Sequence, residues 1–177
     1  MAGLLLLALA PLLLVIGGLV ALSSAGPIVL RQSRMGENGR RFSMFKFRSM
    51  WQDANRAAAG PHKLRVDPRV TPVGRVLRRF SLDELPQLVN VLRGDMTLVG
   101  PRPELPELVE RYEPWQRKRF AVPQGMTGWW QVNGRSDKPM HLNSEDDLYY
   151  VYNYSFWLDL RILARTLLVV ITGRGAF

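Results

Sequence analysis

The sequence lacks cysteine altogether and contains only two histidines, His62 and His141. Without thiols there are no disulfides, thiol nucleophiles or zinc–thiolate sites, and the two histidines exclude a multi-histidine metal site. Acidic residues are also scarce, because 15 Asp and Glu stand against 24 Lys and Arg, a formal net charge of +9. This surplus predicts an anionic partner: nucleic acid, a phosphate-bearing ligand or an acidic membrane surface.

Charge is absent from the first 30 residues, where Leu, Val, Ile and Ala dominate. An uncharged apolar run of about 18 residues or more is a candidate membrane helix. Six basic residues against Glu37 alone follow within residues 31–50, a pattern typical of the cytoplasmic side of a membrane helix. A cleaved signal peptide is the alternative, because residues 23–26 are small or polar. The lack of Lys and Arg at the start argues against it.

Pro11 determines how this segment would meet a bilayer, because a proline inside a helix kinks or breaks it. If the helix breaks, two legs of ~15–18 Å each reach half of a ~30 Å hydrocarbon core and form a re-entrant hairpin with both ends cytoplasmic. If it only kinks, one helix of ~22–25 residues spans the bilayer. Irregular backbone at membrane depth needs partners, so the residues alone favour spanning.

Residues 31–177 predict a compact domain that is mostly helical with small β elements. Thr71 and Pro72 predict an N-cap followed by proline at the first helical position, and residues 73–80 then form a basic amphipathic helix suited to a membrane interface. The last helix is too short and too charged to span. Further elements are expected as helices at residues 85–92 and 104–112, a loop or short strand pair at 125–134, a helix capped by Ser144, and a last helix from Ser155 to Gly173.

Adjacent carboxylates, Asp83 and Glu84, are the first candidates for chemistry. They lie in SLDELPQL, residues 81–88, shortly after Arg78. A structural role is the simpler alternative and is favoured by the residues alone, because Ser81 and Glu84 fit a capping box and acidic residues complement a helix dipole. In the chemical alternative, nearby arginines keep a carboxylate ionised, as a nucleophile or a metal ligand requires.

Two basic segments are candidate phosphate sites. Arg102 lies between two prolines in GDMTLVGPRP, residues 94–103, and this rigid backbone would lower the cost of aiming a guanidinium at a phosphate. An ordinary rigid loop is the alternative. Residues 36–50, with Lys46, lack the P-loop pattern and could bind either a diphosphate or lipid headgroups, of which headgroup contact is favoured.

These motifs together resemble those of the bacterial sugar transferases, the monotopic polyprenyl-phosphate phosphoglycosyl transferases of the PglC type. The resemblance covers residues 26–171 approximately and keeps the order of the motifs. It rests on RQSRMGENG at 31–39, KFRSM at 46–50, DPRVT at 67–71, SLDELPQL at 81–88, GDMTLVGPRP at 94–103, TGWWQVNGR at 127–135 and YVYN at 150–153.

The resemblance implies an N-terminal re-entrant membrane helix broken at Pro11 (residues 1–30) and a compact interfacial catalytic domain with amphipathic helices (residues 31–177). It also implies an enzyme at the cytoplasmic face of the bacterial inner membrane, in contact with its phospholipids. That enzyme would move a sugar-1-phosphate from a UDP-sugar to undecaprenyl phosphate with release of UMP, the first membrane step of exopolysaccharide or glycoconjugate synthesis. Nucleic acid is not expected as a partner, and the sugar and the oligomeric state stay open.

The same resemblance implies roles for individual residues. Asp83 is expected to attack the sugar-linked phosphate and to carry a covalent phospho-sugar, and Glu84 is expected to hold Mg²⁺. Four basic residues are expected to bind the diphosphate or the polyprenyl phosphate: Lys46, Arg78, Arg102 and Arg135. The rival interpretation is a non-catalytic basic membrane scaffold or a tethered nucleic-acid binder, and the latter predicts affinity that falls steeply with salt.

Overall fold

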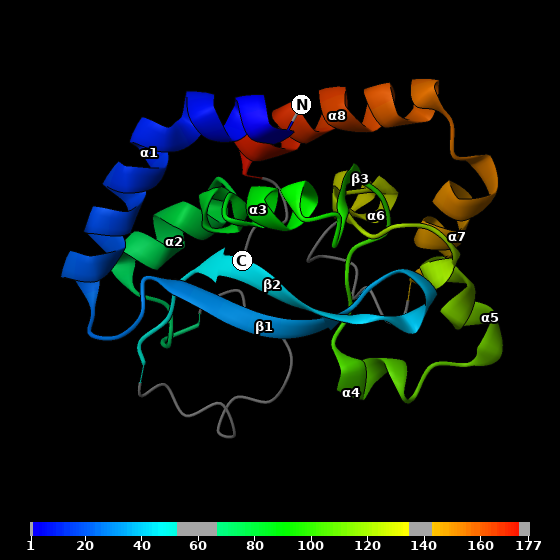
Figure 1. Ribbon diagram of the computed structural model, residues 1–177, viewed down its shortest axis with the longest axis horizontal. Coiled ribbons are helices and arrows are strands. Elements are labelled where there is room, and N and C mark those ends of the chain that lie inside the picture. The colour runs from blue at the N-terminus through cyan, green and yellow to red at the C-terminus, as the bar shows by residue number, and fades with distance from the viewer. Residues whose placement is uncertain (1, 53–66, 135–142, 174–177) are drawn as a thin grey trace.

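The computed structural model describes residues 2–52, 67–134 and 143–173. Figure 1 shows α1 at one end of the molecule and α5 with α7 at the other. In chain order the elements are α1 Ala2–Ser23, β1 Val29–Met35, η1 Glu37–Gly39, β2 Arg41–Phe47, α2 Pro72–Arg79, η2 Leu82–Glu84, α3 Gln87–Leu92, β3 Thr97–Val99, α4 Pro106–Val109, α5 Pro114–Arg117, η3 Lys118–Ala121, β4 Gly125–Thr127, α6 Trp129–Asn133, α7 Ser144–Asn153 and α8 Phe156–Thr172. The mostly helical class with small β elements is therefore confirmed.

Helix α1 is long and apolar enough to cross a membrane, by length and composition. Pro11 lies inside the helix, and Figure 1 shows the ribbon turning partway along α1, as expected where a proline removes a main-chain hydrogen bond. The second leg packs on the rest of the domain, because Ile16 and Val20 are buried against Phe47 and Leu77. Whether α1 re-enters or spans a bilayer stays a prediction.

Strands β1 and β2 form an antiparallel hairpin in which Val29 pairs with Phe47 and Met35 with Arg41. This hairpin was not predicted from the sequence, because basic side chains interrupt the alternation of apolar residues that usually marks a strand. In the turn, Asn38 has a left-handed backbone with φ 53°, which asparagine tolerates better than most residues. The turn and second strand of the hairpin include most of residues 36–50, and Lys46 lies on β2.

The predicted start of α2 and both ends of α8 are confirmed. The Thr71 hydroxyl accepts a hydrogen bond from the Gly74 amide at 2.9 Å, which caps α2. The Ser155 hydroxyl accepts from the Leu158 amide at 3.3 Å, which caps α8. Gly173 ends α8 with φ 66°, a conformation that glycine adopts at little cost.

Other segments differ from expectation. The helix predicted at 104–112 is only α4, and Pro114 starts a separate helix because its missing N–H costs nothing at that position. Residues 129–133, predicted as loop or strand, form α6. The strand lies just before them, where β4 pairs in parallel with β3. Ser144 is the first residue of α7 rather than its cap, and its hydroxyl accepts from Gln116 at 3.3 Å.

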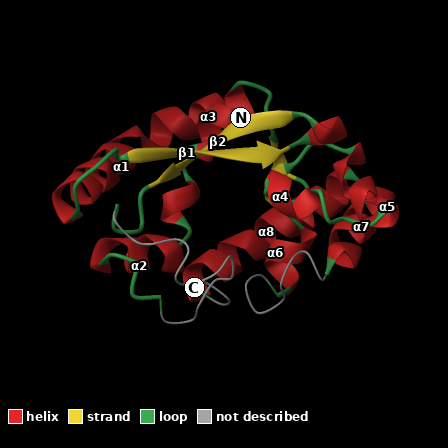
Figure 2. Cartoon of the chain, turned by 90° about the horizontal axis from the view of Figure 1, so that it is seen from below, coloured by secondary structure: helices red, strands yellow, loops and turns green. Residues whose placement is uncertain are grey.

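The elements pack around separate apolar clusters. One joins β3, α7 and α8 through Val99, Tyr150, Leu158 and Ile162, and another gathers Val109, Tyr112 and Phe120. In the turned view of Figure 2, the ribbons of the β1–β2 hairpin and α3 lie on one side of the molecule and those of α2 and α6 on the other. The candidate site lies where β2, η2 and the loop after β3 meet.

Candidate active site

Asp83 and Glu84 lie in the 3₁₀ turn η2, which precedes α3. Ser81, just before the turn, has a left-handed backbone with φ 55°, and its side chain makes no capping hydrogen bond there. The capping-box alternative is therefore wrong. A non-glycine residue in this conformation costs free energy and is typical of functional sites. The turn presents both carboxylates to neighbouring elements instead of to the N-terminus of a regular helix.

Lys46 reaches both carboxylates from β2. Its Nζ lies 2.8 Å from Asp83 Oδ2 and 3.3 Å from Glu84 Oε1. The Asp83 side chain is only 3% exposed. An ionised carboxylate removed from water needs a nearby cation or hydrogen-bond donors. Lys46 is therefore the cation that meets the buried Asp83 side chain directly.

Arg102 binds Glu84 from the loop after β3. Its Nη2 donates to Glu84 Oε1 at 2.6 Å, and its Nη1 donates to Oε2 at 3.1 Å. This bidentate pairing is the strong form of an arginine–carboxylate contact. Burial is the largest single effect and disfavours the charged guanidinium, but the carboxylates of Glu84, Asp83 and Glu104 together outweigh it and raise the pKa of Arg102. Arg102 is therefore a fixed cation beside the carboxylates.

Arg78 lies at the edge of the same group. Its Nε donates to Ser49 Oγ at 2.9 Å, which directs the side chain from α2 toward the segment that follows β2. Burial lowers the pKa of Arg78, and the charge of Asp83 acts in the opposite direction. Of the four predicted basic residues, Lys46 and Arg102 contact the carboxylates directly, whereas Arg135 lies outside the described residues.

Asn90 was not predicted from the sequence; it is fully buried and links α3 to β2. Its Oδ1 accepts from the Phe45 amide at 3.0 Å, and its Nδ2 donates to the Ser43 carbonyl at 2.8 Å. These contacts hold the part of β2 just before Lys46 against α3, the helix that follows η2. A lone amide in the otherwise apolar end of α3 is the signal that could have revealed it, because buried polar groups need partners.

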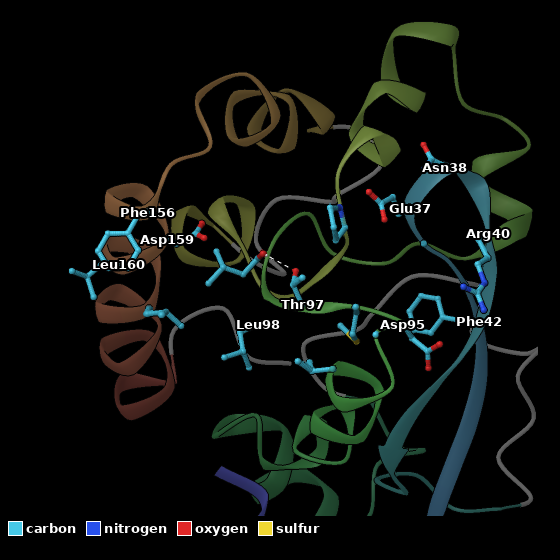
Figure 3. Close-up of a pocket in the computed structure, with 17 residues that line it drawn as sticks. Glu37, Asn38, Arg40, Phe42, Asp95, Thr97, Leu98, Phe156, Asp159 and Leu160 are labelled. Atoms are coloured by element: carbon cyan, nitrogen blue, oxygen red, sulfur yellow. Dashed lines mark hydrogen bonds between the residues drawn. The ribbon is translucent and has the colours of Figure 1, made fainter. Parts of the chain in front are cut away.

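A cavity of about 950 Å³ lies elsewhere, between η1, β3 and α8. Figure 3 shows its lining, which includes Arg40, Phe42, Leu98 and Phe156. None of the residues that line it is an acidic or basic residue of the candidate site. Large volume alone does not make a reaction centre, and the convergence of charged groups at η2 is the stronger indication.

The carboxylates offer oxygen ligands that suit Mg²⁺. No group of three or more His, Cys, Asp or Glu side chains that could hold a metal is present among residues 2–52, 67–134 and 143–173. Mg²⁺ is usually held by only one or two carboxylates together with water and substrate phosphates, so the pair at η2 fits this ion. Because Arg102 and Lys46 both contact Oε1 of Glu84, an ion bound to this oxygen would have to share it with them or displace them.

The geometry brings together an anionic nucleophile candidate and fixed cations. Such a site can attract a phosphate ester, spread the charge that develops on its oxygens and place a carboxylate against phosphorus. The arrangement therefore suits phosphoryl transfer better than a surface whose charges only attract a membrane.

Comparisons with known proteins bear on the same chain. A family model described as Bacterial sugar transferase matches residues 1–173. An undecaprenyl-phosphate glucose phosphotransferase from Komagataeibacter xylinus is 45% identical over 189 residues, which cover 98% of this chain and 35% of that relative. A UDP-glucose:undecaprenyl-phosphate glucose-1-phosphate transferase from Xanthomonas campestris pv. campestris is 42% identical over 180 residues, which cover 97% of this chain and 37% of the relative.

A shorter relative is matched over most of its length. The exopolysaccharide production protein ExoY from Sinorhizobium fredii is 40% identical over 186 residues, which cover 97% of this chain and 82% of ExoY. The chain thus spans about a third of the two longer relatives and most of ExoY. The family model covers nearly the whole chain, including β2, η2 and the loop after β3. This protein therefore belongs to the bacterial sugar transferase family.

Proposed function

We propose that this protein transfers a sugar-1-phosphate from a UDP-sugar to undecaprenyl phosphate, through a covalent phospho-sugar on Asp83. The observation that carries the proposal is the buried Asp83 carboxylate held 2.8 Å from Lys46, next to the Glu84–Arg102 pair. The relatives support the substrate class, because the names of two of them combine undecaprenyl phosphate with a glucose or glucose-1-phosphate transfer.

In the first step, an Asp83 carboxylate oxygen attacks the phosphorus that carries the sugar. A P–O bond to Asp83 forms, the P–O bond of the diphosphate bridge breaks, and UMP leaves with the bonding electron pair. Negative charge grows on the bridging oxygen and on the phosphoryl oxygens as this happens. Lys46 and Arg102 are the cations best placed to stabilise that charge, and Arg78 adds a third at the edge of the site.

In the second step, an oxygen of undecaprenyl phosphate attacks the same phosphorus. A new diphosphate bond forms, the acyl-phosphate bond to Asp83 breaks, and the carboxylate is regenerated. Splitting one transfer into two displacements lets each substrate use the same cationic site in turn. Mg²⁺ held by Glu84 would supply additional charge neutralisation for the phosphates, and Arg135 is proposed as a further phosphate ligand.

The proposed location is the cytoplasmic face of the bacterial inner membrane. Apolar side chains are exposed on α1 and on α8, which lie along the same upper side of the molecule in Figure 1. Among them are Leu4, Leu7, Phe156, Trp157, Leu168 and Ile171. Exposed apolar surface of this extent favours contact with lipid, and the basic residues that follow α1 favour the cytoplasmic side. A re-entrant α1 belongs to the same proposal.

The test is the intact mass of purified protein incubated with Mg²⁺ and a panel of UDP-sugars, without undecaprenyl phosphate. Wild type is expected to gain the mass of one phospho-sugar, and Asp83→Asn is expected to gain none. Asp95→Asn is the matched control, because its amide oxygen can still accept the bond that Asn90 donates to Asp95. An adduct on Asp83→Asn would refute the nucleophile. If wild type forms no adduct and releases no UMP after the lipid is added, the proposed reaction is wrong.

A further inference from the structure

A second group of buried charges adjoins the candidate site and is centred on Arg119 of η3. The Arg119 side chain is 0% exposed, and its Nη2 lies 2.5 Å from Oδ2 of Asp147 on α7, which is also 0% exposed. Removing two charges from water costs much of what their attraction returns, so a buried pair is weak evidence for stability alone. The role of the pair is therefore better inferred from the groups that Arg119 holds in place.

The Arg119 guanidinium holds the loop that carries Arg102. Its Nη2 donates to the main-chain oxygen of Arg102 at 2.8 Å, and its Nη1 donates to the Tyr112 hydroxyl at 2.8 Å. The Tyr112 hydroxyl in turn donates to Glu104 Oε2 at 3.1 Å. Glu104 lies two residues after Arg102. The rigid, planar guanidinium of Arg119 therefore binds this loop at two points, directly at Arg102 and through Tyr112 at Glu104.

Arg34 of β1 supports the same loop. Its Nη1 lies 3.6 Å from Glu104 Oε1 and donates to the Pro103 carbonyl at 3.4 Å. Pro101 and Pro103 have no N–H, so this stretch cannot hold itself through main-chain donors of its own. Donors from η3 and β1 take that role. Main-chain donors hold the two ends of the loop, because the Gly125 amide donates to the Pro101 carbonyl and the Met35 amide to the Glu104 carbonyl. Between them, the Arg102 and Pro103 carbonyls accept from the side chains of Arg119 and Arg34.

We propose that Arg119 is a positioning residue, which fixes the main chain at Arg102 so that the Arg102 side chain reaches Glu84 in its bidentate geometry. The Arg102–Glu84 bonds of 2.6 and 3.1 Å leave little tolerance, because a displacement of about 1 Å would take one of them outside hydrogen-bond range. Misplacement of that size at a reacting centre can cost roughly a hundredfold in rate. Asp147 acts with Arg119 by orienting the Nη2 end of its guanidinium.

The expected effect on the rate rests on the proposed function. The test therefore combines a measurement of transfer activity with a second measurement that does not depend on activity. The central variant is Arg119→Lys, which keeps the charge but cannot reach Asp147, Tyr112 and the Arg102 carbonyl together. The matched control is Tyr112→Phe, which removes the Nη1 bond and the indirect link to Glu104 but leaves the direct Nη2 bond to the Arg102 carbonyl intact. Full-length protein in detergent is used throughout, with a UDP-sugar that gives turnover with wild type.

In the activity arm, Arg119→Lys is expected to lower kcat/KM by about tenfold or more, and Tyr112→Phe by less than about threefold. Combining Arg119→Lys with Arg102→Ala should give the same kcat/KM as Arg102→Ala alone. Arg119 is proposed to act only by positioning the Arg102 side chain, which the double variant lacks. Multiplicative losses in the double variant would overturn the proposal, since they would show that Arg119 acts independently of Arg102.

The second arm is hydrogen exchange of the Gly100 amide, which donates to the Thr127 carbonyl at 2.9 Å beside the Arg102 loop. Arg119→Lys should speed its exchange several-fold, whereas Tyr112→Phe should leave it near the wild-type rate. Unchanged exchange in Arg119→Lys would refute the positioning role even if the enzyme proves to have another substrate. If Arg119→Lys does not fold, Asp147→Asn replaces it and should show the same pattern to a smaller extent. Wild-type exchange and kinetics in that variant would then refute the proposal.

Discussion

Gly100 lies where the main chain after β3 runs directly against the main chain of residues 123–127, and replacing it with alanine tests this packing directly. A Cβ on Gly100 would lie under 3.0 Å from the Pro123 carbonyl and 2.9 Å from the Gly125 amide nitrogen. Both neighbours are main-chain atoms, so neither can move aside by rotating a side chain. The Gly100→Ala substitution therefore has to separate β3 from the chain at Gly125.

The magnitude follows from what that separation disrupts. The Gly100 amide donates to the Thr127 carbonyl at 2.9 Å, and the Gly125 amide donates to the Pro101 carbonyl at 2.9 Å. Losing two such bonds and overpacking the site should lower the free energy of unfolding by roughly 2–5 kcal/mol. For a chain of this size that corresponds to a fall of about 5–15 °C in Tm. Because Arg102 follows the disrupted pairing, transfer activity should fall beyond the loss of folded protein.

The assay is thermal unfolding in detergent, followed by turnover of the fraction that remains folded. The matched control is Gly18→Ala in α1, because a Cβ there meets nothing within 4 Å and alanine favours a helix by about 1 kcal/mol over glycine. Its Tm should equal that of wild type or exceed it slightly. A Gly100→Ala protein that unfolds within about 1 °C of wild type would refute the steric argument.

Two further predictions concern buried charges outside η2. Arg48 of the segment after β2 donates from Nη2 to the Val20 and Ser24 carbonyls at 3.0 and 2.6 Å and from Nε to Ser24 Oγ at 2.9 Å. Arg48→Ala should therefore release the end of α1, seen as faster proteolysis near Ser24, and Arg48→Lys should restore part of the protection. Cleavage of Arg48→Ala at the wild-type rate would contradict this role. Burial raises the pKa of Asp147 from 3.8 to about 6, although Arg119 opposes the shift. The folded state then binds this proton more tightly than the unfolded state, so the stability contributed by protonation is present below about pH 3.8 and is lost as the pH rises through about 6. Between about pH 4 and pH 7, wild type should lose more stability than Asp147→Asn, as denaturant titrations at several pH values would measure. Equal losses in both proteins would contradict the raised pKa.

Local chemistry in the sequence was enough to predict several elements. Thr71 with Pro72 and Ser155 with Gly173 act within one helical turn, so their capping could be inferred without knowing the fold. The apolar N-terminal helix could also be inferred without knowing the fold, because a long uncharged apolar run is enough to predict it. The motifs around Asp83 and Arg102 indicated the family, which the comparisons then confirmed.

The sequence could not reveal contacts between residues far apart in the chain. The β1–β2 hairpin, the tie made by Asn90 and the grip of Arg119 on the Arg102 loop depend on such contacts. The structure also decided against the capping box at Ser81, because a left-handed residue turns the chain into η2 before α3 begins.

The sequence by itself determined the kinds of groups available: an apolar first helix, adjacent carboxylates at residues 83 and 84, and an excess of basic residues. Only the tertiary structure decided which cation meets which carboxylate, namely Lys46 with Asp83 and Arg102 with Glu84. The physical reason is distance. Helix caps act over one turn of chain, whereas an ion pair requires two side chains within about 4 Å, and folding alone brings β2, η2 and the loop after β3 that close together.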